Sequence, residues 1–287
     1  MDSVEYIKQL DSLVKVIQPG IFVFAIAMML LEVMVLSLRK IPRNSRGGIV
    51  SLSSGLFVFG LEALADFLLY LALCYWLYDH KIFDLRFTWY AWVLCFVLYD
   101  LMFYVSHRLQ HRVRVLWCFH SVHHTSTEMR LTSAVRGSMF DFLFNPPFFV
   151  WMCVLGIHPL MFIAVRTVSR MWGILEHMHE SNLGHTPLLN KVFIMPDVHR
   201  VHHGKNEIYL DKNYAEVFSV WDRLFGTYVE YTEQPQYGIL KPVNDNSFVD
   251  IQFSPWKDLA YDFKRSKGAV NKMRVLFMPP GWKLPTT

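Results

Sequence analysis

Histidines at short, regular spacings are the residues of this sequence with the clearest chemistry. The chain has 13 of them, and eight form a pair and two His-x-x-His-His triplets: His107 and His111; His120, His123 and His124; His199, His202 and His203. Residues three and four apart share one face of a helix, so each group can direct its imidazoles to one point. Neutral imidazole is the commonest metal ligand in proteins, and the pattern therefore predicts a metal centre.

The number of these histidines indicates more than one metal ion. A lone zinc takes three or four protein ligands, whereas about eight to ten nitrogens suit two metals. Between the triplets, the run 176–180 holds two imidazoles two residues apart, which face opposite sides of a helix unless the helix ends there. The Ser, Asn and Gly residues at 181–184 indicate that it ends nearby. We expect His179 to be the ninth ligand and keep His177 and His185 as further candidates.

Acidic residues near the histidines are candidates for orienting them. Asp100 precedes His107 by seven residues and lies on the same helical stripe if the helix is continuous. A carboxylate there is expected either to bind the outer nitrogen of a ligand imidazole or to pair with a nearby arginine. Glu176, Asp197 and Asp211 are comparable candidates.

The composition indicates a membrane protein. Hydrophobic residues make up 53% of the chain and aromatic residues 16%, while only 18% are charged, against about one quarter in soluble domains. The formal charge of +4, without a basic stripe interleaved with aromatics, argues against nucleic-acid binding. Four cysteines without paired spacing are expected to be buried thiols. Acidic residues precede the first apolar run, so no secretory signal peptide is expected.

Four apolar regions are long enough to enter a bilayer, which needs about 20 residues per helix. Three are single spans, at Ile21–Leu38, Leu56–Leu77 and Thr88–Tyr104. The fourth, 140–175, is interrupted at 156–159 and is expected to form two spans or a re-entrant hairpin. The sequence thus predicts an all-α fold with a stem of four to five spans or a hairpin.

Basic residues orient this stem. Four of them follow the first span at positions 39–46, and five arginines follow the third span: Arg108, Arg112, Arg114, Arg130 and Arg136. The positive-inside rule then puts all histidine groups on the cytoplasmic face, in a helical cap over the stem. We expect N-terminal spans over residues 1–105, a two-metal domain with the membrane hairpin over 106–235, and a cytoplasmic tail over 236–287.

In order and spacing, these motifs resemble the fatty acid hydroxylase and sterol desaturase superfamily. That family carries His-x-x-x-His, His-x-x-His-His, a later histidine region and a final His-x-x-His-His, which correspond here to 107–111, 120–124, 177–179 and 199–203. The stretches 195–204, 211–214, 221–227 and 277–282 are most similar to the branch containing alkylglycerol monooxygenase. The resemblance runs from the third span to the C-terminus.

The resemblance implies a di-iron centre that uses molecular oxygen to hydroxylate or desaturate an unactivated C–H bond of a lipid. It also implies an external reductant, either a pterin or a b-type cytochrome, because the chain contains no haem or flavin domain. The membrane would be the endoplasmic reticulum in a eukaryote or the inner membrane in a bacterium. The resemblance leaves the lipid, the choice between hydroxylation and desaturation, and the oligomeric state open.

Two other classes of protein use clustered histidines. A zinc-dependent membrane hydrolase would need a carboxylate base, and the sequence has no His-Glu-x-x-His motif. A non-catalytic protein stabilised by metal would close its site with four ligands, fewer than the histidines available here. The phenylalanines between 140 and 149 either line a path for the lipid or pack in the ordinary way, and packing is the more common role.

Overall fold

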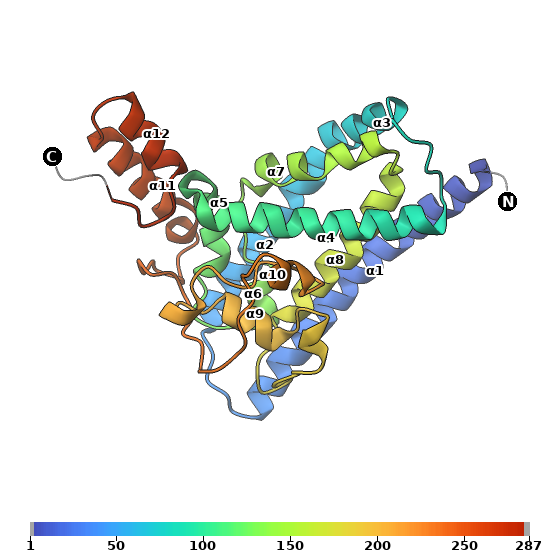
Figure 1. Ribbon diagram of the computed structural model, residues 1–287. Coiled ribbons are helices and arrows are strands. Elements are labelled where there is room, and N and C mark those ends of the chain that lie inside the picture. The colour runs from blue at the N-terminus through green and yellow to red at the C-terminus, as the bar shows by residue number, and fades with distance from the viewer. Residues whose placement is uncertain (1–2, 284–287) are drawn as a thin grey trace.

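The computed structural model describes residues 3–283 and is built almost entirely from helices (Figure 1). Within these residues the only extended pairing is an isolated bridge between Phe193 and Phe218. The predicted all-α class is therefore confirmed. The elements are α1 (Ser3–Leu38), α2 (Ser45–Ala65), the π-turn η1 (Asp66–Tyr70), α3 (Leu71–Asp79), α4 (Trp89–Arg112), α5 (Arg114–His124), α6 (Leu131–Ala134), α7 (Asp141–Phe144), η2 (Pro146–Phe148), η3 (Val150–Leu155), α8 (Pro159–Glu176), η4 (Leu189–Lys191), α9 (Pro196–His202), η5 (Glu207–Tyr209), α10 (Val220–Leu224), α11 (Phe248–Arg265) and α12 (Ala269–Phe277).

Three helical segments within residues 3–283 are long and apolar enough to cross a membrane. They are Lys8–Leu38, Ser45–Asp79 and Trp89–Arg112; the first two contain the first two spans expected from the sequence, and the third overlaps Thr88–Tyr104 in all but its first residue. The fourth region is divided between a shorter apolar stretch, Asp141–Leu155, and α8. The structure thus has three candidate spans by length and composition, where four to five or a hairpin were expected.

The break in the fourth region lies where the sequence predicts it. Gly156 has a φ of +96°, and a Cβ at this position would lie 2.1 Å from the carbonyl oxygen of Phe83. Only glycine fits both the left-handed backbone and this close approach. His158 then caps α8, because its Nδ1 accepts a hydrogen bond of 3.2 Å from the amide of Leu160. His158 is buried and serves as a helix cap in the turn.

Ion pairs join α2 to α8 within the predicted membrane region. The Arg170 guanidinium donates two hydrogen bonds, of 2.7 and 2.8 Å, to the Glu62 carboxylate. One turn away, Arg166 donates to Asp66 at 2.8 Å. Charges at this depth are costly unless paired, which explains how two acids are accommodated in an apolar segment. The pairs also fix α8, which ends just before His177, against α2.

Two of the arginines that we counted as loop charges are buried. Arg136 is about 1% exposed and donates to Ser51, to Thr125 and to backbone carbonyls. Arg130 donates to the carbonyl of Asn44 and pairs with Glu128. These side chains hold the loop after α5 to the start of α2. They are structural cations rather than exposed loop charges.

The segment from 236 onward, which we expected to be a C-terminal tail, contains the helices α11 and α12. α11 packs against α5, α12 and the first half of α2. Buried Leu259 and Val275 contact Cys118 of α5 and form a small core there. All four cysteines, Cys118 among them, are free and buried, as predicted. The largest core lies elsewhere, between α3, α4, η3 and α8.

Candidate metal centre

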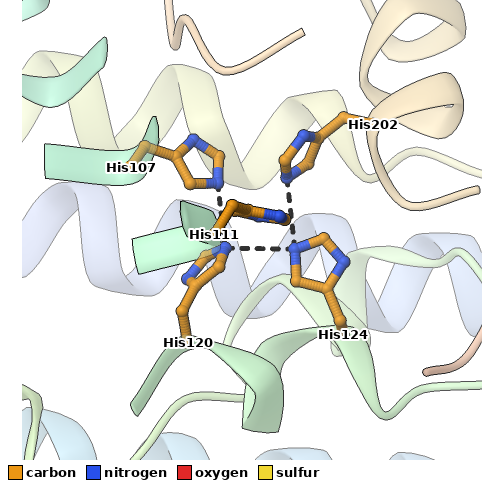
Figure 2. Close-up of side chains that lie close together, drawn as sticks. All are labelled: His107, His111, His120, His124 and His202. Atoms are coloured by element: carbon orange, nitrogen blue, oxygen red, sulfur yellow. Dashed lines mark hydrogen bonds between the residues drawn. The ribbon is translucent and has the colours of Figure 1, made fainter. Parts of the chain in front are cut away.

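Nine histidines, the eight of the three motifs and His177, meet at the C-terminal end of α4, and they form two groups. In each group, one ligand atom from every residue lies within 4.8 Å of all the others. Group A is His107, His111, His120, His124 and His202; group B is His123, His177, His199 and His203. Figure 2 shows the five rings of group A converging from α4, α5 and α9. Among the described residues, these are the two sets able to hold a metal ion.

The two His-x-x-His-His triplets each contribute to both groups, in opposite ways. On α5, the i, i+4 pair His120 and His124 enters group A, while His123 enters group B. At α9, the i, i+4 pair His199 and His203 enters group B, while His202 enters group A. Residues four apart share a helix face and the third residue is offset from it, so one triplet can serve two neighbouring centres. The rings of His124 and His203 stack at 4.3 Å between the two groups.

The inner nitrogens of the rings are close together. In group A, Nε2 of His120 lies 2.9 Å from Nε2 of His107 and 3.0 Å from Nε2 of His124. In group B, Nε2 of His177 lies 3.1 Å from that of His123 and 3.2 Å from that of His199. Most of these rings are buried. The Nε2 atoms therefore point at a shared, protein-enclosed point in each group.

The outer nitrogens are held by the backbone. Nδ1 of His107 lies 2.8 Å from the carbonyl of Tyr214, and Nδ1 of His202 lies 2.8 Å from that of Lys212. In group B, the Nδ1 atoms of His123 and His177 bind two more carbonyls, at 2.9 and 2.8 Å. A carbonyl only accepts, so each of these Nδ1 atoms carries the proton. In the neutral ring Nε2 is then unprotonated and presents a lone pair.

In these tautomers the Nε2 lone pairs of neighbouring rings repel one another unless a cation lies between them. The Nε2 lone pairs of His123 and His177 face each other at 3.1 Å with no proton between them in the neutral rings. Protonation is disfavoured, because burial lowers the pKa of His123 to about 4. Burial and the neighbouring imidazole also lower the pKa of His177 well below its ordinary value. A metal cation is the group that satisfies such inward lone pairs, and anchoring of the outer nitrogens is typical of metal-bound histidines.

The donor sets fit two metal ions in size and number. A metal about 2.1 Å from each nitrogen would place opposite ligands about 4.2 Å apart, within the spread of each group. Group A offers five nitrogens, one more than a tetrahedral zinc site uses, and group B offers four. The fifth nitrogen of group A suits an ion of higher coordination number, whereas group B alone would also suit a tetrahedral ion.

Of the histidines between the triplets, the structure brings His177 to the site and leaves His179 and His185 outside it. α8 ends at Glu176, and His177 occupies the cap position with its ring in group B. His179 shares its Nδ1 with Ser181, at 2.8 Å, and lines a separate cavity of about 160 Å³. His185 is exposed and packs on the ring of Tyr231. The preference for His179 was wrong in this structure, because α8 ends at Glu176 and the ring of the first residue after it, His177, enters group B.

Two of the four predicted carboxylates lie beside site histidines. An oxygen of buried Glu176 is 3.4 Å from Nδ1 of His199, a close contact without a hydrogen bond. An oxygen of Asp211 is 3.7 Å from Nδ1 of His111, and its other oxygen accepts from Arg112. Each can orient its histidine without contacting the inner nitrogens.

The other two carboxylates hold loops instead. Asp100 accepts from the amides of Val217 and Phe218 and from the indole of Trp221. Seven helical residues place it about 10 Å along the axis from His107, too far for contact with that imidazole. Neither role that we expected for Asp100 is observed. Asp197 accepts from Thr186 and Asn190, away from the inner nitrogens.

Comparison with known proteins is consistent with this geometry. Residues 92–227, which include all nine site histidines, match the family model described as fatty acid hydroxylase. The chain belongs to the fatty acid hydroxylase family. No solved structure matches it.

Curated relatives of this fatty acid hydroxylase family member act on lipids, according to their names. Alkylglycerol monooxygenase from Homo sapiens is 30% identical over 269 residues, 90% of this chain and 58% of that protein. The Xenopus tropicalis protein of the same name is 32% identical over 195 residues, 67% of this chain and 42% of its own length. An ornithine lipid hydroxylase from Rhizobium tropici is 31% identical over 137 residues, which are 47% of this chain and 41% of that protein. The chain spans about half the length of these relatives.

Several residues that hold the site histidines in place were not predicted as site residues from the sequence. Lys212 and Tyr214 act through their carbonyls, so their side chains give no signal in the sequence. Fully buried Asp222 holds this segment by accepting from the amides of Tyr214 and Ala215 and from the hydroxyl of Thr227. A single acid in the largely apolar and aromatic run 218–225 was the available signal for Asp222.

Proposed function

We propose that this chain is a membrane-bound, non-haem di-iron oxygenase that hydroxylates a lipid with molecular oxygen. The observation that carries the proposal is the pair of adjacent histidine groups, with five and four converging nitrogens. Their fixed tautomers direct lone pairs inward, which suits two metal ions rather than none. Membership of the fatty acid hydroxylase family supports the same reaction class.

Iron is the metal that this reaction class favours. Two irons would supply the redox chemistry that activates oxygen, which zinc cannot do because it has no accessible redox change. The nine histidines would hold the ions, and Glu176 and Asp211 would orient His199 and His111. The carbonyls of Gly173, Arg136, Lys212 and Tyr214 keep four further rings in the tautomer that ligation requires.

The substrate is a lipid that reaches the site from the bilayer, of the alkylglycerol, fatty acyl or sterol type. The relatives named above are a monooxygenase of alkylglycerols and a hydroxylase of ornithine lipids, which favours hydroxylation over desaturation. One oxygen atom enters a C–H bond of the lipid, and the other leaves as water after two electrons and two protons are added. An external pterin or b-type cytochrome supplies the electrons. The site faces the cytoplasm, from the endoplasmic reticulum or a bacterial inner membrane.

The phenylalanines between 140 and 149 contribute packing to this arrangement. Phe144 packs on Phe119 at 5.7 Å, and Phe149 stacks on Tyr99 at 4.7 Å between ring centroids. Phe140 contacts the rings of Phe253 and Trp256 on α11. These contacts favour the packing role over a lipid-lined path.

The test is oxygen incorporation by the purified full-length protein. Iron-loaded protein in nanodiscs would be given a chemical reductant, ¹⁸O₂ and each lipid class in turn, and products would be analysed by mass spectrometry. The proposal predicts an alcohol carrying one ¹⁸O atom, lost in His177→Ala and retained in the matched control His179→Ala. Oxygen-independent turnover that places solvent oxygen in the product would contradict it and favour a zinc hydrolase.

A further inference from the structure

The C-terminal helices α11 and α12 form a hairpin with an uncovered amphipathic face. Figure 1 shows both helices projecting beyond the end of α4 at which α5 begins. On α12, three bulky apolar side chains at helical spacing are exposed: Val270 (64%), Met273 (54%) and Phe277 (53%). The opposite side of α12 is covered, since Val275 is buried against α5 and α11. The exposed stripe therefore does not belong to the core of the hairpin.

Basic side chains are frequent on the two helices and next to them. Seven lie between positions 257 and 283, namely Lys257, Lys264, Arg265, Lys267, Lys272, Arg274 and Lys283. None of them forms an ion pair within the part of the chain that the structure describes. Two acidic residues of α11, Asp258 and Asp262, pair with Lys241 and Arg114, outside the hairpin. The hairpin thus combines an exposed apolar stripe with seven basic side chains that have no ion-pair partner, and helical spacing puts Arg274 at the edge of the stripe, i+4 from Val270 and i−3 from Phe277.

The hairpin starts beside the exposed apolar surface of α2. The ring of Phe248, the first residue of α11, lies 5.2 Å from the ring of Phe57 on α2. Phe57 and its neighbour Leu56 are exposed, as are Ile49 and Leu52 nearer the start of the candidate span Ser45–Asp79. The base of the hairpin therefore adjoins the first, exposed apolar part of a candidate membrane span.

We propose that α11 and α12 bind the anionic lipid surface on the same side of the membrane as the histidine centre. An apolar stripe flanked by lysine and arginine is the pattern of helices that lie in the headgroup region. A second copy of this chain fits the face less well. In a two-fold contact through the stripe, Arg274 and its neighbouring cations would meet their own copies, and like charges oppose association.

Spin labels on full-length protein test this placement. Because the four native cysteines are buried, Met273→Cys and Lys272→Cys each give one reactive thiol. At about 100° per residue, Lys272 points roughly away from the stripe and serves as the matched control. Power-saturation measurements in nanodiscs with one chain each would compare phosphatidylserine-containing discs with pure phosphatidylcholine discs.

The proposal predicts that the label at 273 is accessible to oxygen and shielded from a water-soluble nickel complex in the anionic discs. The label at 272 should be accessible to the nickel complex in both kinds of disc. The variant Lys264→Gln/Lys267→Gln/Arg274→Gln should abolish the difference between the lipids at 273. Equal nickel access at both positions would overturn the proposal, and so would a label at 273 shielded from both reagents, which indicates a protein partner.

Discussion

The two histidine groups are neighbours but are held in different ways. Three outer nitrogens of group A depend on one short segment, 211–214, which supplies two carbonyls and one carboxylate. Three outer nitrogens of group B depend on two elements: the carbonyl of Arg136 after α6, and α8, which supplies the carbonyl of Gly173 and the carboxylate of Glu176. Three of the five donors of group A therefore rest on one segment, whereas three of the four donors of group B rest on two.

A centre with more metal-binding nitrogens is therefore not necessarily the one that better tolerates substitutions in its supporting residues. A change in segment 211–214 can disturb three ligands of group A at once and leave group B intact. A change at a single support of group B disturbs one ligand. The two centres should therefore be separable by substitution, although α5 and α9 serve both.

The largest effect is expected from removing a ligand of group B. His177→Ala leaves that group with three nitrogens, and we expect metal content to fall from about two ions per chain to about one, with activity at background. His179→Ala, two residues away, should keep both ions and its activity, because its ring lies outside both groups. Elemental analysis and turnover of the two variants measure this. If His179→Ala lost a metal ion and His177→Ala kept both, the ninth ligand would be His179 rather than His177.

Substitution of Asp222 should weaken group A alone. An asparagine cannot accept from both the Tyr214 and Ala215 amides as the carboxylate does, so the carbonyl that anchors His107 should shift. Loss of such support typically lowers metal affinity by about 10–100-fold. Competition with a chelator would show one weakened ion in Asp222→Asn and one unchanged.

The control for this prediction is Asp197→Asn. Asp197 is also buried and also accepts several hydrogen bonds, but from Thr186 and Asn190. Its substitution should lower the melting temperature without selective weakening of group A. Equal loss of both ions in Asp222→Asn would show that segment 211–214 does not support one group separately.

Substitution of the two carboxylates beside the centres should weaken metal binding to different degrees. Glu176, 2% exposed, should matter more to His199 than Asp211, whose side chain is 39% exposed, matters to His111. Solvent screens the exposed contact. We expect Glu176→Gln to weaken the ion in group B by about tenfold, and Asp211→Asn to weaken that in group A by less. An equal or larger effect of Asp211→Asn in chelator competition would contradict this order.

The prediction with the smallest expected effect on metal binding is a pH dependence of stability that comes from a residue beside group B. Burial raises the pKa of Glu216, which accepts from Ser169 and lies against Gly173, to about 8 from its ordinary 4.5. The folded chain then binds this proton more tightly than the unfolded chain does. The resulting stability is complete below pH 4.5 and is lost as the pH rises through about 8.

Glu216→Gln removes this loss, so its melting temperature should exceed that of the wild type increasingly as the pH rises from about 6 to 9. Asp211→Asn is the matched control. Burial would raise the pKa of Asp211, but His111 and Arg112 lower it overall. Its substitution should not produce the same gain at alkaline pH. A constant difference between Glu216→Gln and wild type across this range would argue against a buried, protonated Glu216.

The histidine spacings were sufficient to predict that the eight motif histidines converge. Spacing at i, i+3 and i+4 constrains side chains locally, and the three motifs needed only to meet. Spacing could not tell which centre each ring enters, because that depends on how α5 and α9 face each other. The choice between His177 and His179 depended on the last turn of α8, where sequence patterns are least reliable.

The supports of the centre could not be predicted for a different reason. Tyr214 and Lys212 act through backbone atoms that every residue type possesses. Asp100 lies on the expected helix but bonds a loop more than a hundred residues later in the chain. Arg136 looked like an exposed loop charge and is buried, because its hydrogen-bond partners come from α2 and from Asp245. Such contacts depend on tertiary packing rather than on local sequence.

The central claim is that the two histidine groups hold two irons, and metal analysis tests it most directly. Full-length protein would be purified anaerobically in detergent without added metal, and its iron and zinc would be counted against chain concentration. We predict about two irons per chain, with Mössbauer spectra showing iron bound by nitrogen. One zinc per chain with no iron would contradict the account.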